Sequence, residues 1–119
     1  MYKKNSDLQV RTKSFALRII QLFSSLPNTT EAQVIGKQVL RSGTSVGAHY
    51  REGARARSTK EFISKLEVGI QELNETSHWL ELLAESGIVK ENLLVDLLDE
   101  ANQLVAILTT ITKNSRPPK

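Results

Sequence analysis

Four basic residues between positions 37 and 55 recur at spacings that bring them to one flank of a helix. At 100° per residue they fall within an arc of about 80°. This basic strip consists of Lys37, Arg41, Arg51 and Arg55. The positive region continues through Arg57, Lys60 and Lys65. Such an array suits phosphate groups, because neutralising each phosphate releases bound counterions and unspecific binding needs no base-reading side chain.

The seven cations therefore predict an interface for the backbone of RNA or DNA. Two other arrangements give the same pattern, namely a solvated helix face and a salt-bridged contact between copies of the chain. Aromatic residues make up only 5% of the sequence, which argues against binding by base stacking. We therefore expect binding that depends weakly on sequence, and the pattern leaves the type of nucleic acid open.

Small residues follow a second stripe of the same segment. At intervals of three, four and seven residues the stripe takes in Gly36, Gly43, Gly47, Tyr50 and Ala54. A glycine inside a helix costs about 0.5–1 kcal/mol relative to alanine, so several in one helix require a compensating contact. Without Cβ atoms, another helix can approach closely. The stripe predicts tight helix packing, either within the chain or with a neighbouring subunit.

The two histidines, His49 and His78, give no catalytic or metal-binding pattern. A metal site in a helical bundle uses two Glu-x-x-His pairs, and the sequence holds only one, Glu75-Thr-Ser-His78. No arginine stands before either histidine where RNA-cleaving bundles of the HEPN type carry one, and neither histidine has a nucleophile-and-acid pattern nearby. We therefore expect that the protein is not an enzyme and has no cofactor and no metal.

At 119 residues, the chain has the length of one domain with its own core. It has no cysteine, which excludes disulfides and thiolate ligands and fits a reducing cytoplasm. No apolar stretch approaches the length of a membrane span, and the first ten residues lack the apolar core of a signal peptide. We expect a cytoplasmic protein without membrane association.

The net charge of +3 is unevenly distributed along the chain. Residues 1–65 carry twelve Lys and Arg against four Asp and Glu, whereas residues 66–112 carry one Lys against nine Asp and Glu. Such asymmetry indicates an anionic partner, or a neighbouring copy of the chain in which positive and negative surfaces meet. A homo-oligomer is therefore an expected partner alongside RNA or DNA.

Apolar residues at helical spacing predict four helices, at about 7–25, 28–57, 58–86 and 90–112. Ser58-Thr-Lys-Glu61 has the capping-box pattern, and Gly87 suits a left-handed C-cap. No segment alternates with a period of two, so no strand is expected. Short connections favour antiparallel neighbours, and the sequence therefore predicts an all-α, antiparallel up-and-down four-helix bundle over 7–113. Residues 1–6 are expected to form a short N-terminal arm and 114–119 a disordered tail.

Two runs of sequence resemble a known family. They are RSGTSVGA at 41–48 and ETSHWLELL at 75–83, within a longer similar stretch over 40–83. FALRIIQLFSSLP at 15–27 also fits. The chain resembles the four-helix-bundle proteins encoded by intervening sequences within bacterial 23S rRNA genes. The family usually has Asn at the position of His49, a small departure.

The resemblance implies a bacterial, cytoplasmic bundle that assembles as a ring, typically a homopentamer. Related accessory variability proteins of diversity-generating retroelements bind nucleic acid and a reverse transcriptase through a basic surface. The resemblance thus favours a nucleic-acid-binding accessory protein, with a reverse transcriptase as partner if the gene belongs to a retroelement. The alternative is a protein-binding adaptor or self-assembling scaffold that does not bind nucleic acid.

Overall fold

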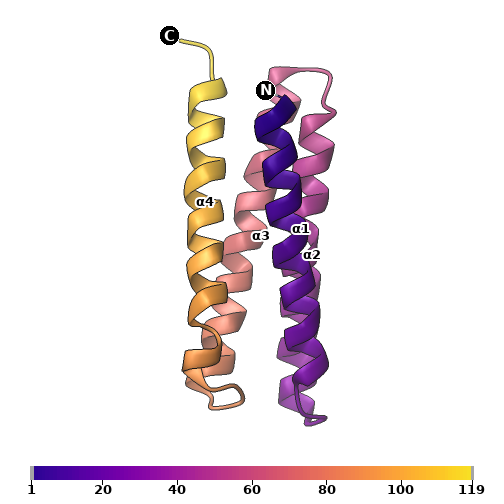
Figure 1. Ribbon diagram of the computed structural model, residues 1–119, viewed down its shortest axis with the longest axis vertical. Coiled ribbons are helices and arrows are strands. Elements are labelled where there is room, and N and C mark those ends of the chain that lie inside the picture. Colours follow the sequence, from indigo (N-terminus) through magenta and orange to yellow (C-terminus); the bar gives the residue numbers. More distant parts are fainter. Residues whose placement is uncertain (1, 119) are drawn as a thin grey trace.

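Four long helices run up and down along one axis (Figure 1). The computed structural model describes the backbone of residues 2–118 and the side chains of residues 7–118. The helices are α1 (Tyr2–Ser25), α2 (Thr30–Ala54), α3 (Thr59–Glu85) and α4 (Val95–Ser115), and a 3-10 turn, η1 (Glu91–Leu93), precedes α4. No strand occurs within residues 2–118. The predicted all-α, antiparallel four-helix bundle is confirmed.

Local sequence signals define most of the helix ends. The Thr29 side chain accepts a hydrogen bond from the Ala32 backbone N–H at 3.3 Å, and Ser58 accepts one from the Glu61 N–H at 3.1 Å. Both side chains satisfy an amide that has no partner inside its own helix. After α3, Gly87 adopts φ = 79°, as expected for a glycine that stops a helix.

Four helix boundaries differ from those expected. α1 begins at Tyr2 rather than near residue 7, so residues 2–6, expected to form an arm, continue the helix. The helix continues through residues 2–6 because they contain no Gly or Pro that would stop it. Met1, also expected in the arm, lies outside the described residues. α2 ends at Ala54, three residues early, because a tight turn precedes the Ser58 cap.

The fourth helix begins only at Val95, after η1, and Leu94 between the two lies in the core. α4 ends at Ser115, so residues 114 and 115, expected to begin a disordered tail, are helical.

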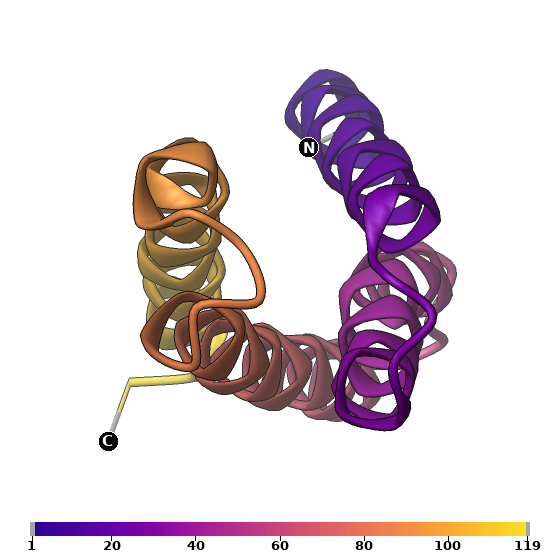
Figure 2. The ribbon, with the colours of Figure 1, turned by 90° about the horizontal axis from the view of Figure 1, so that it is seen from below.

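The helices are arranged as an open square with one loose corner. α2 packs against both α1 and α3, and α3 packs against α4, whereas α1 and α4 meet at few places, as Figure 2 shows. Phe15, Ile19, Leu73 and Leu104 are among the fully buried side chains at the centre. The loose corner leaves a flank between α1 and α4 that the core does not close.

Hydrogen bonds between polar side chains join α1 to α4 across this flank. The Arg11 guanidinium donates two hydrogen bonds to the Glu100 carboxylate, at 3.0 and 2.7 Å, and a third to Gln103 at 3.0 Å. The hydrogen bond to Glu100 raises the pKa of Arg11 above its usual value. The two-pronged geometry fixes the position of α1 relative to α4 at this height of the bundle.

The small-residue stripe packs within the chain, against α1. A Cβ atom on Gly43 would lie 2.8 Å from Cγ1 of Ile19, and one on Gly47 would lie 3.0 Å from Oγ1 of Thr12. Gly36 faces Leu26, which directly follows α1, and Phe23 in the last turn of α1. α2 therefore approaches α1 closely, which accounts for three glycines whose intrinsic helix propensity is poor.

The other two members of the predicted stripe contribute differently. Tyr50 is 1% exposed and belongs to the core, where burial raises the pKa of its hydroxyl to about 12. Ala54 is half-buried at the end of α2. The stripe is therefore an intrachain packing surface over most of its length.

We expect Gly43→Leu to destabilise the bundle by about 1–3 kcal/mol, because the new side chain would collide with Ile19. Gly69→Ala is the matched control, because a Cβ atom at position 69 would lie no closer than 3.9 Å to any neighbouring atom. This second change should stabilise by about 0.5–1 kcal/mol through helix propensity. Urea unfolding of both variants checks the pair. Equal stability of Gly43→Leu and the parent would contradict the close approach of α1 and α2.

Candidate nucleic-acid interface

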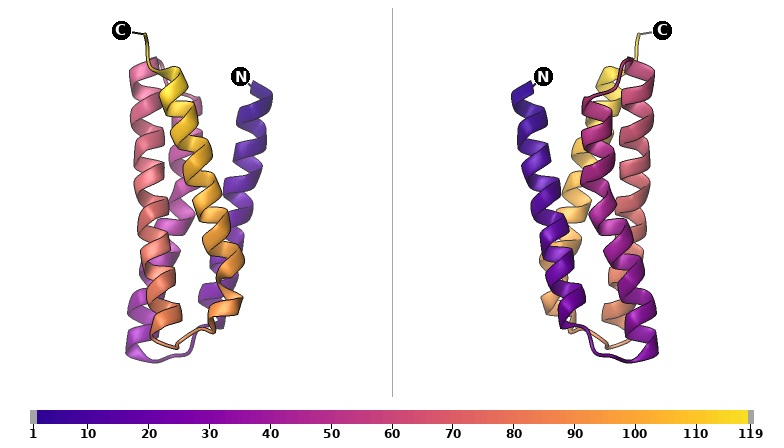
Figure 3. Two further views of the ribbon diagram at one scale, coloured as in Figure 1. Left: turned by 90° about the vertical axis from the view of Figure 1, so that its left-hand side faces the viewer. Right: turned by 90° about the vertical axis from the view of Figure 1, so that its right-hand side faces the viewer.

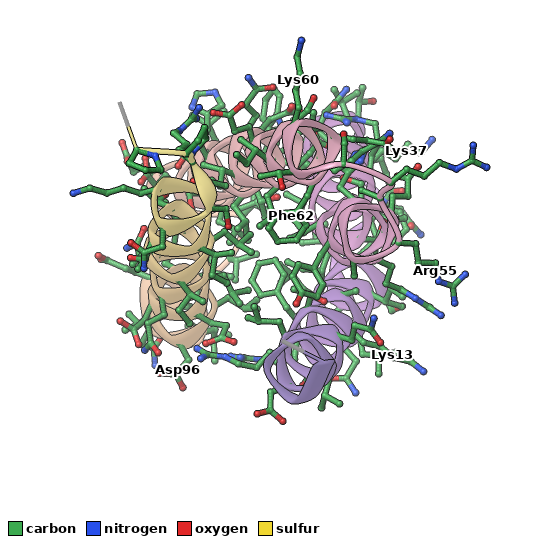
Figure 4. The ribbon with its side chains drawn as sticks, turned by 90° about the horizontal axis from the view of Figure 1, so that it is seen from above. Lys13, Lys37, Arg55, Lys60, Phe62 and Asp96 are labelled. Atoms are coloured by element: carbon green, nitrogen blue, oxygen red, sulfur yellow. The ribbon has the colours of Figure 1, made fainter. Side chains whose placement is uncertain are left out.

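Three cations of the basic strip lie exposed along the outer face of α2, the last of them at its C-cap. Lys37, Arg51 and Arg55 make no ion pair with any side chain of residues 7–118. Figure 4 shows Lys37 and Arg55 projecting away from the bundle on the same side, with Asp96 of α4 on the opposite side. The positive charge of these three side chains therefore remains available to an anionic ligand.

Arg41, the fourth member of the basic strip, is held by α3. Its guanidinium donates to the Glu72 carboxylate at 3.2 Å and to Glu75 in a shorter contact. The hydrogen bond to Glu75 raises the pKa of Arg41 above its usual value. Its charge is thus compensated within the chain. Arg41 therefore stabilises the contact between α2 and α3 and does not offer a free charge to a ligand.

The acceptors of Arg41 belong to a polar cluster between α2 and α3. The Ser45 hydroxyl donates to Glu72, and the Trp79 indole N–H donates to Glu75 at 3.0 Å. These two bonds and the Arg41 pair satisfy both carboxylates at a partly buried interface. The hydrogen bond from Trp79, followed by that from Arg41, lowers the pKa of Glu75.

This cluster joins the two most distinctive runs of the sequence. Arg41 and Ser45 come from 41–48, and Glu75 and Trp79 come from 75–83. Behind them, the Thr76 hydroxyl lies 2.9 Å from that of Ser42 in the buried interface. Glu72 and Glu75 were not predicted as partners of Arg41 from the sequence, although their spacing of three residues places them on one helix face.

The three remaining predicted cations lie near the turn between α2 and α3. Arg57 and Lys60 are exposed, and Lys60 projects from a different side of the molecule than Lys37 and Arg55 (Figure 4). Lys65 lies 3.5 Å from the Glu52 carboxylate. The structure therefore brings together only part of the predicted set: three unpaired cations along α2, two at the turn, and two in ion pairs.

A recess of about 440 Å³ lies beside the basic strip, between α1 and α2. Most of its lining residues are small or uncharged, and its cations are Lys13 of α1 and Arg51 of α2. It is lined by Gln9, Val10, Thr12, Lys13, Ala16, Thr44, Gly47, Ala48 and Arg51, none of which is acidic. The sequence did not point to Lys13, because only the packing of two helices places it beside Arg51.

The two histidines occupy structural positions. Nδ1 of His49 lies 3.4 Å from the Glu52 carboxylate but makes no hydrogen bond there, nor with other described atoms. This approach is therefore a weak electrostatic contact. His78 packs edge-on against Trp79, with ring centroids 4.9 Å apart. Within the described part of the chain, no group of three or more His, Cys, Asp or Glu could hold a metal ion.

The fold and the charged outer helix define an all-α, up-and-down four-helix bundle with one basic face. The model of the 23S rRNA-intervening sequence protein family matches residues 4–110, and the chain belongs to this family. A similar solved structure is that of a protein of unknown function from the S23 ribosomal protein family of Bacteroides thetaiotaomicron. It is 35% identical, covers 92% of this chain and 98% of its own, and superposes with a TM-score of 0.86.

No significant relative is found among curated proteins. Among the described residues, no helix combines the length and the apolar character needed to cross a membrane.

The Glu75 contacts predict a specific acid sensitivity. The folded-state pKa of Glu75 lies below its usual value of 4.5, so its contribution to stability is present above that pH and is lost as the pH falls through the lower folded value. Trp79→Phe removes the indole donor and should reduce stability at pH 7 by about 1 kcal/mol. It should also flatten the decline of melting temperature below about pH 4.5.

Glu75→Gln is the control for this prediction, because the amide oxygen still accepts from Trp79 but the side chain no longer titrates. The two variants are compared by thermal melts between pH 3 and pH 7, a range that brackets the usual pKa of 4.5 for this carboxyl group. A parent protein whose acid response matches that of Glu75→Gln would show that this carboxylate has no part in the response.

Proposed function

We propose that this protein is a non-enzymatic, oligomeric bundle that binds the sugar–phosphate backbone of RNA or DNA through the outer face of α2, as a cytoplasmic accessory factor. The observation that carries the proposal is the division of the basic strip. Lys37, Arg51 and Arg55 are exposed and have no carboxylate partner among the described side chains, whereas Arg41 is compensated by α3. A row of uncompensated cations along a helix attracts nucleic acid, because the phosphates of its backbone carry negative charge at regular intervals.

The dimensions of the strip suit a polymer better than a small anion. From Lys37 to Arg55 the helix rises by about 27 Å, at 1.5 Å per residue. Phosphates on one strand of a duplex recur about every 3.4 Å along the axis, so the strip spans about eight of them. A single small anion would occupy only one of these cations.

The other side chains favour contacts to the backbone rather than to bases. Each Phe, Tyr and Trp side chain within residues 7–118 is buried or half-buried, so none of them offers an exposed platform for stacking. The exposed groups of the basic strip are positively charged ammonium and guanidinium groups, which bind phosphate without reading sequence. The name of the family refers to intervening sequences of 23S rRNA, which is consistent with an RNA-associated role.

A protein-binding role is a second candidate, and a separate observation favours it. Val10, Leu17 and Ile20 are large apolar side chains exposed on the outer face of α1. An apolar stripe of this kind does not serve phosphate binding, and it is typical of contacts with protein. A homo-oligomer, or a reverse transcriptase if the gene belongs to a retroelement, would be the partner.

The nucleic-acid proposal predicts a defined loss of salt dependence. The double variant Lys37→Gln, Arg55→Gln should bind all sequences of RNA or DNA more weakly, and its slope of log affinity against log salt should decrease by about two. Arg51 is kept in this variant because it also lines the recess. Fluorescence anisotropy with a labelled oligonucleotide across a salt series measures both quantities.

Arg41→Gln provides the contrast, because its guanidinium is already paired with Glu72 and Glu75. It should lower the thermal stability while leaving the salt slope within error of the parent. If the parent binds neither RNA nor DNA at low salt, or if the double variant keeps the full slope, the outer face of α2 is not a phosphate interface.

A further inference from the structure

The recess between α1 and α2 is built from two matching stretches of helix. Its lining runs from Gln9 to Ala16 on α1 and from Thr44 to Arg51 on α2. The two helices run side by side in opposite directions, as the right-hand view of Figure 3 shows. Each stretch rises by about 10 Å along its helix. With this length and a volume of about 440 Å³, the recess has the size of a site for a small organic molecule.

Three small residues leave the space in this recess. Gly47 has no side chain, and the side chains of Ala16 and Ala48 are single methyl groups. Ala48 is exposed and Ala16 is half-buried, so these methyl groups border the solvent. The recess therefore offers a small apolar surface on which the body of a ligand can pack.

The recess carries positive charge that no described carboxylate compensates. Lys13 and Arg51 are exposed, and neither makes an ion pair with a side chain of residues 7–118. Residues 1–6, whose side chains lie outside the described residues, contain no Asp or Glu. Asp7, the first acidic residue of the sequence, lines the groove between α1 and α4 instead. The two cations of the recess therefore suit an anionic group.

Thr44 adds a hydrogen-bond acceptor to the same recess. Its hydroxyl donates its proton to the Leu40 carbonyl at 2.6 Å, so the oxygen remains available as an acceptor. Along α2, Thr44 and Arg51 stand about 10 Å apart. A ligand that satisfies both ends of the recess therefore carries an anionic group at one end and an O–H or N–H donor at the other.

We propose that the recess binds a single nucleoside phosphate. Lys13 and Arg51 hold its phosphate by charge-assisted hydrogen bonds. Its sugar and base pack on Ala16 and Ala48, where a hydroxyl or amino group of the ligand donates to Thr44. The proposal rests on the proposed function, because Arg51 belongs both to the basic strip and to the recess, and it adds a site for one nucleotide to a surface of phosphate contacts.

Other anions fit the recess less well. Inorganic phosphate would pair with Lys13 and Arg51, but it would leave the methyl groups of Ala16 and Ala48 without a partner. The carboxylate side chains of an acidic peptide are acceptors only, so they offer no donor to Thr44. A nucleoside phosphate has the anionic group, the apolar ring faces and the donors within one small molecule.

Two sources supply this chemistry. A free mononucleotide can enter the recess directly, and a single strand of RNA or DNA presents nucleotides whose bases are unpaired. A duplex presents none unless a base is first taken out of the stack. Figure 4 shows Lys13 of α1 and Arg55 of α2 on the same side of the molecule, so a strand bound along the basic strip would pass the recess.

Titration with adenosine monophosphate, followed by the backbone amide signals in NMR spectra, tests the site. The signals of Gly47 and Ala48 should shift and reach saturation, because both residues line the recess. A parallel titration with inorganic phosphate should give an affinity at least about tenfold lower, because this ion makes no contact with the methyl groups or with Thr44.

Ala48→Leu fills the recess without changing its charge. The position is exposed on a helix and leucine is nearly as good a helix former as alanine, so the variant should fold. Its affinity for adenosine monophosphate should fall by at least about tenfold, because the leucine side chain occupies the space of the ligand. Ala106→Leu is the matched control: it makes the same change at an exposed alanine of α4 and should leave the affinity unchanged.

Lys13→Gln tests the charge of the recess separately from its shape. It should also weaken the binding of adenosine monophosphate by about tenfold, because one charged partner of the phosphate is lost. Lys90→Gln removes the same charge at an exposed position beside η1 and should have no effect. Circular dichroism verifies that each variant remains helical.

The source of the nucleotide follows from the response of Ala48→Leu to polymers. Weaker binding of single-stranded RNA with unchanged binding of an RNA duplex supports the site and assigns it to a nucleotide of a strand. Unchanged binding of both polymers, together with weaker binding of adenosine monophosphate, supports the site and assigns it to a free nucleotide.

Three results would overturn the site: adenosine monophosphate that binds no more tightly than inorganic phosphate, an Ala48→Leu variant with the affinity of the parent, or polyglutamate that competes as well as the nucleotide. The last result would show that the recess selects charge alone. None of them alters the salt slope of the Lys37→Gln, Arg55→Gln variant, which tests the basic strip by its own measurement.

Discussion

The close approach of α1 to α2 is the contact on which the other features of this bundle depend. It is possible because Gly43 and Gly47 have no side chain, so that Ile19 and Thr12 of α1 lie almost against the backbone of α2. α1 is thereby attached to α2 more closely than to α4, and a groove remains between α1 and α4. The same approach creates the recess that brings Lys13 beside Arg51.

On its side facing α3, α2 is held by ion pairs and hydrogen bonds to carboxylates. Arg41 and Ser45 bind the carboxylates of α3, and this pairing fixes how α2 is rotated about its axis relative to α3. With glycines turned to α1 and Arg41 turned to α3, the remaining cations have no neighbouring helix to pair with. The exposure of Lys37 and Arg55 is thus a consequence of the two contacts that hold α2 in place.

The helical content and the order of the helices could be predicted from periodicity, because each apolar stripe is local and needs no knowledge of the other helices. The close packing of Gly43 was also predictable, since glycines in a helix require a compensating contact. The pairing of Arg41 with Glu72 was not, because it depends on the relative rotation of two helices. Lys13 was missed for the same reason. The start of α1 at Tyr2 was missed because residues 2–6 contain no strong signal for or against a helix.

If cations left unpaired by internal packing bind phosphates, RNA must shield the lysine amine on the outer face of α2, and footprinting of lysine amines measures this protection. The protein is acetylated with and without a saturating RNA, and each lysine is quantified by mass spectrometry. The account predicts that Lys37 on the outer face of α2 is protected by RNA, whereas Lys90 at the start of η1 and Lys113 near the end of α4 remain as reactive as before. Equal reactivity of Lys37 in the presence and absence of bound RNA would contradict the account.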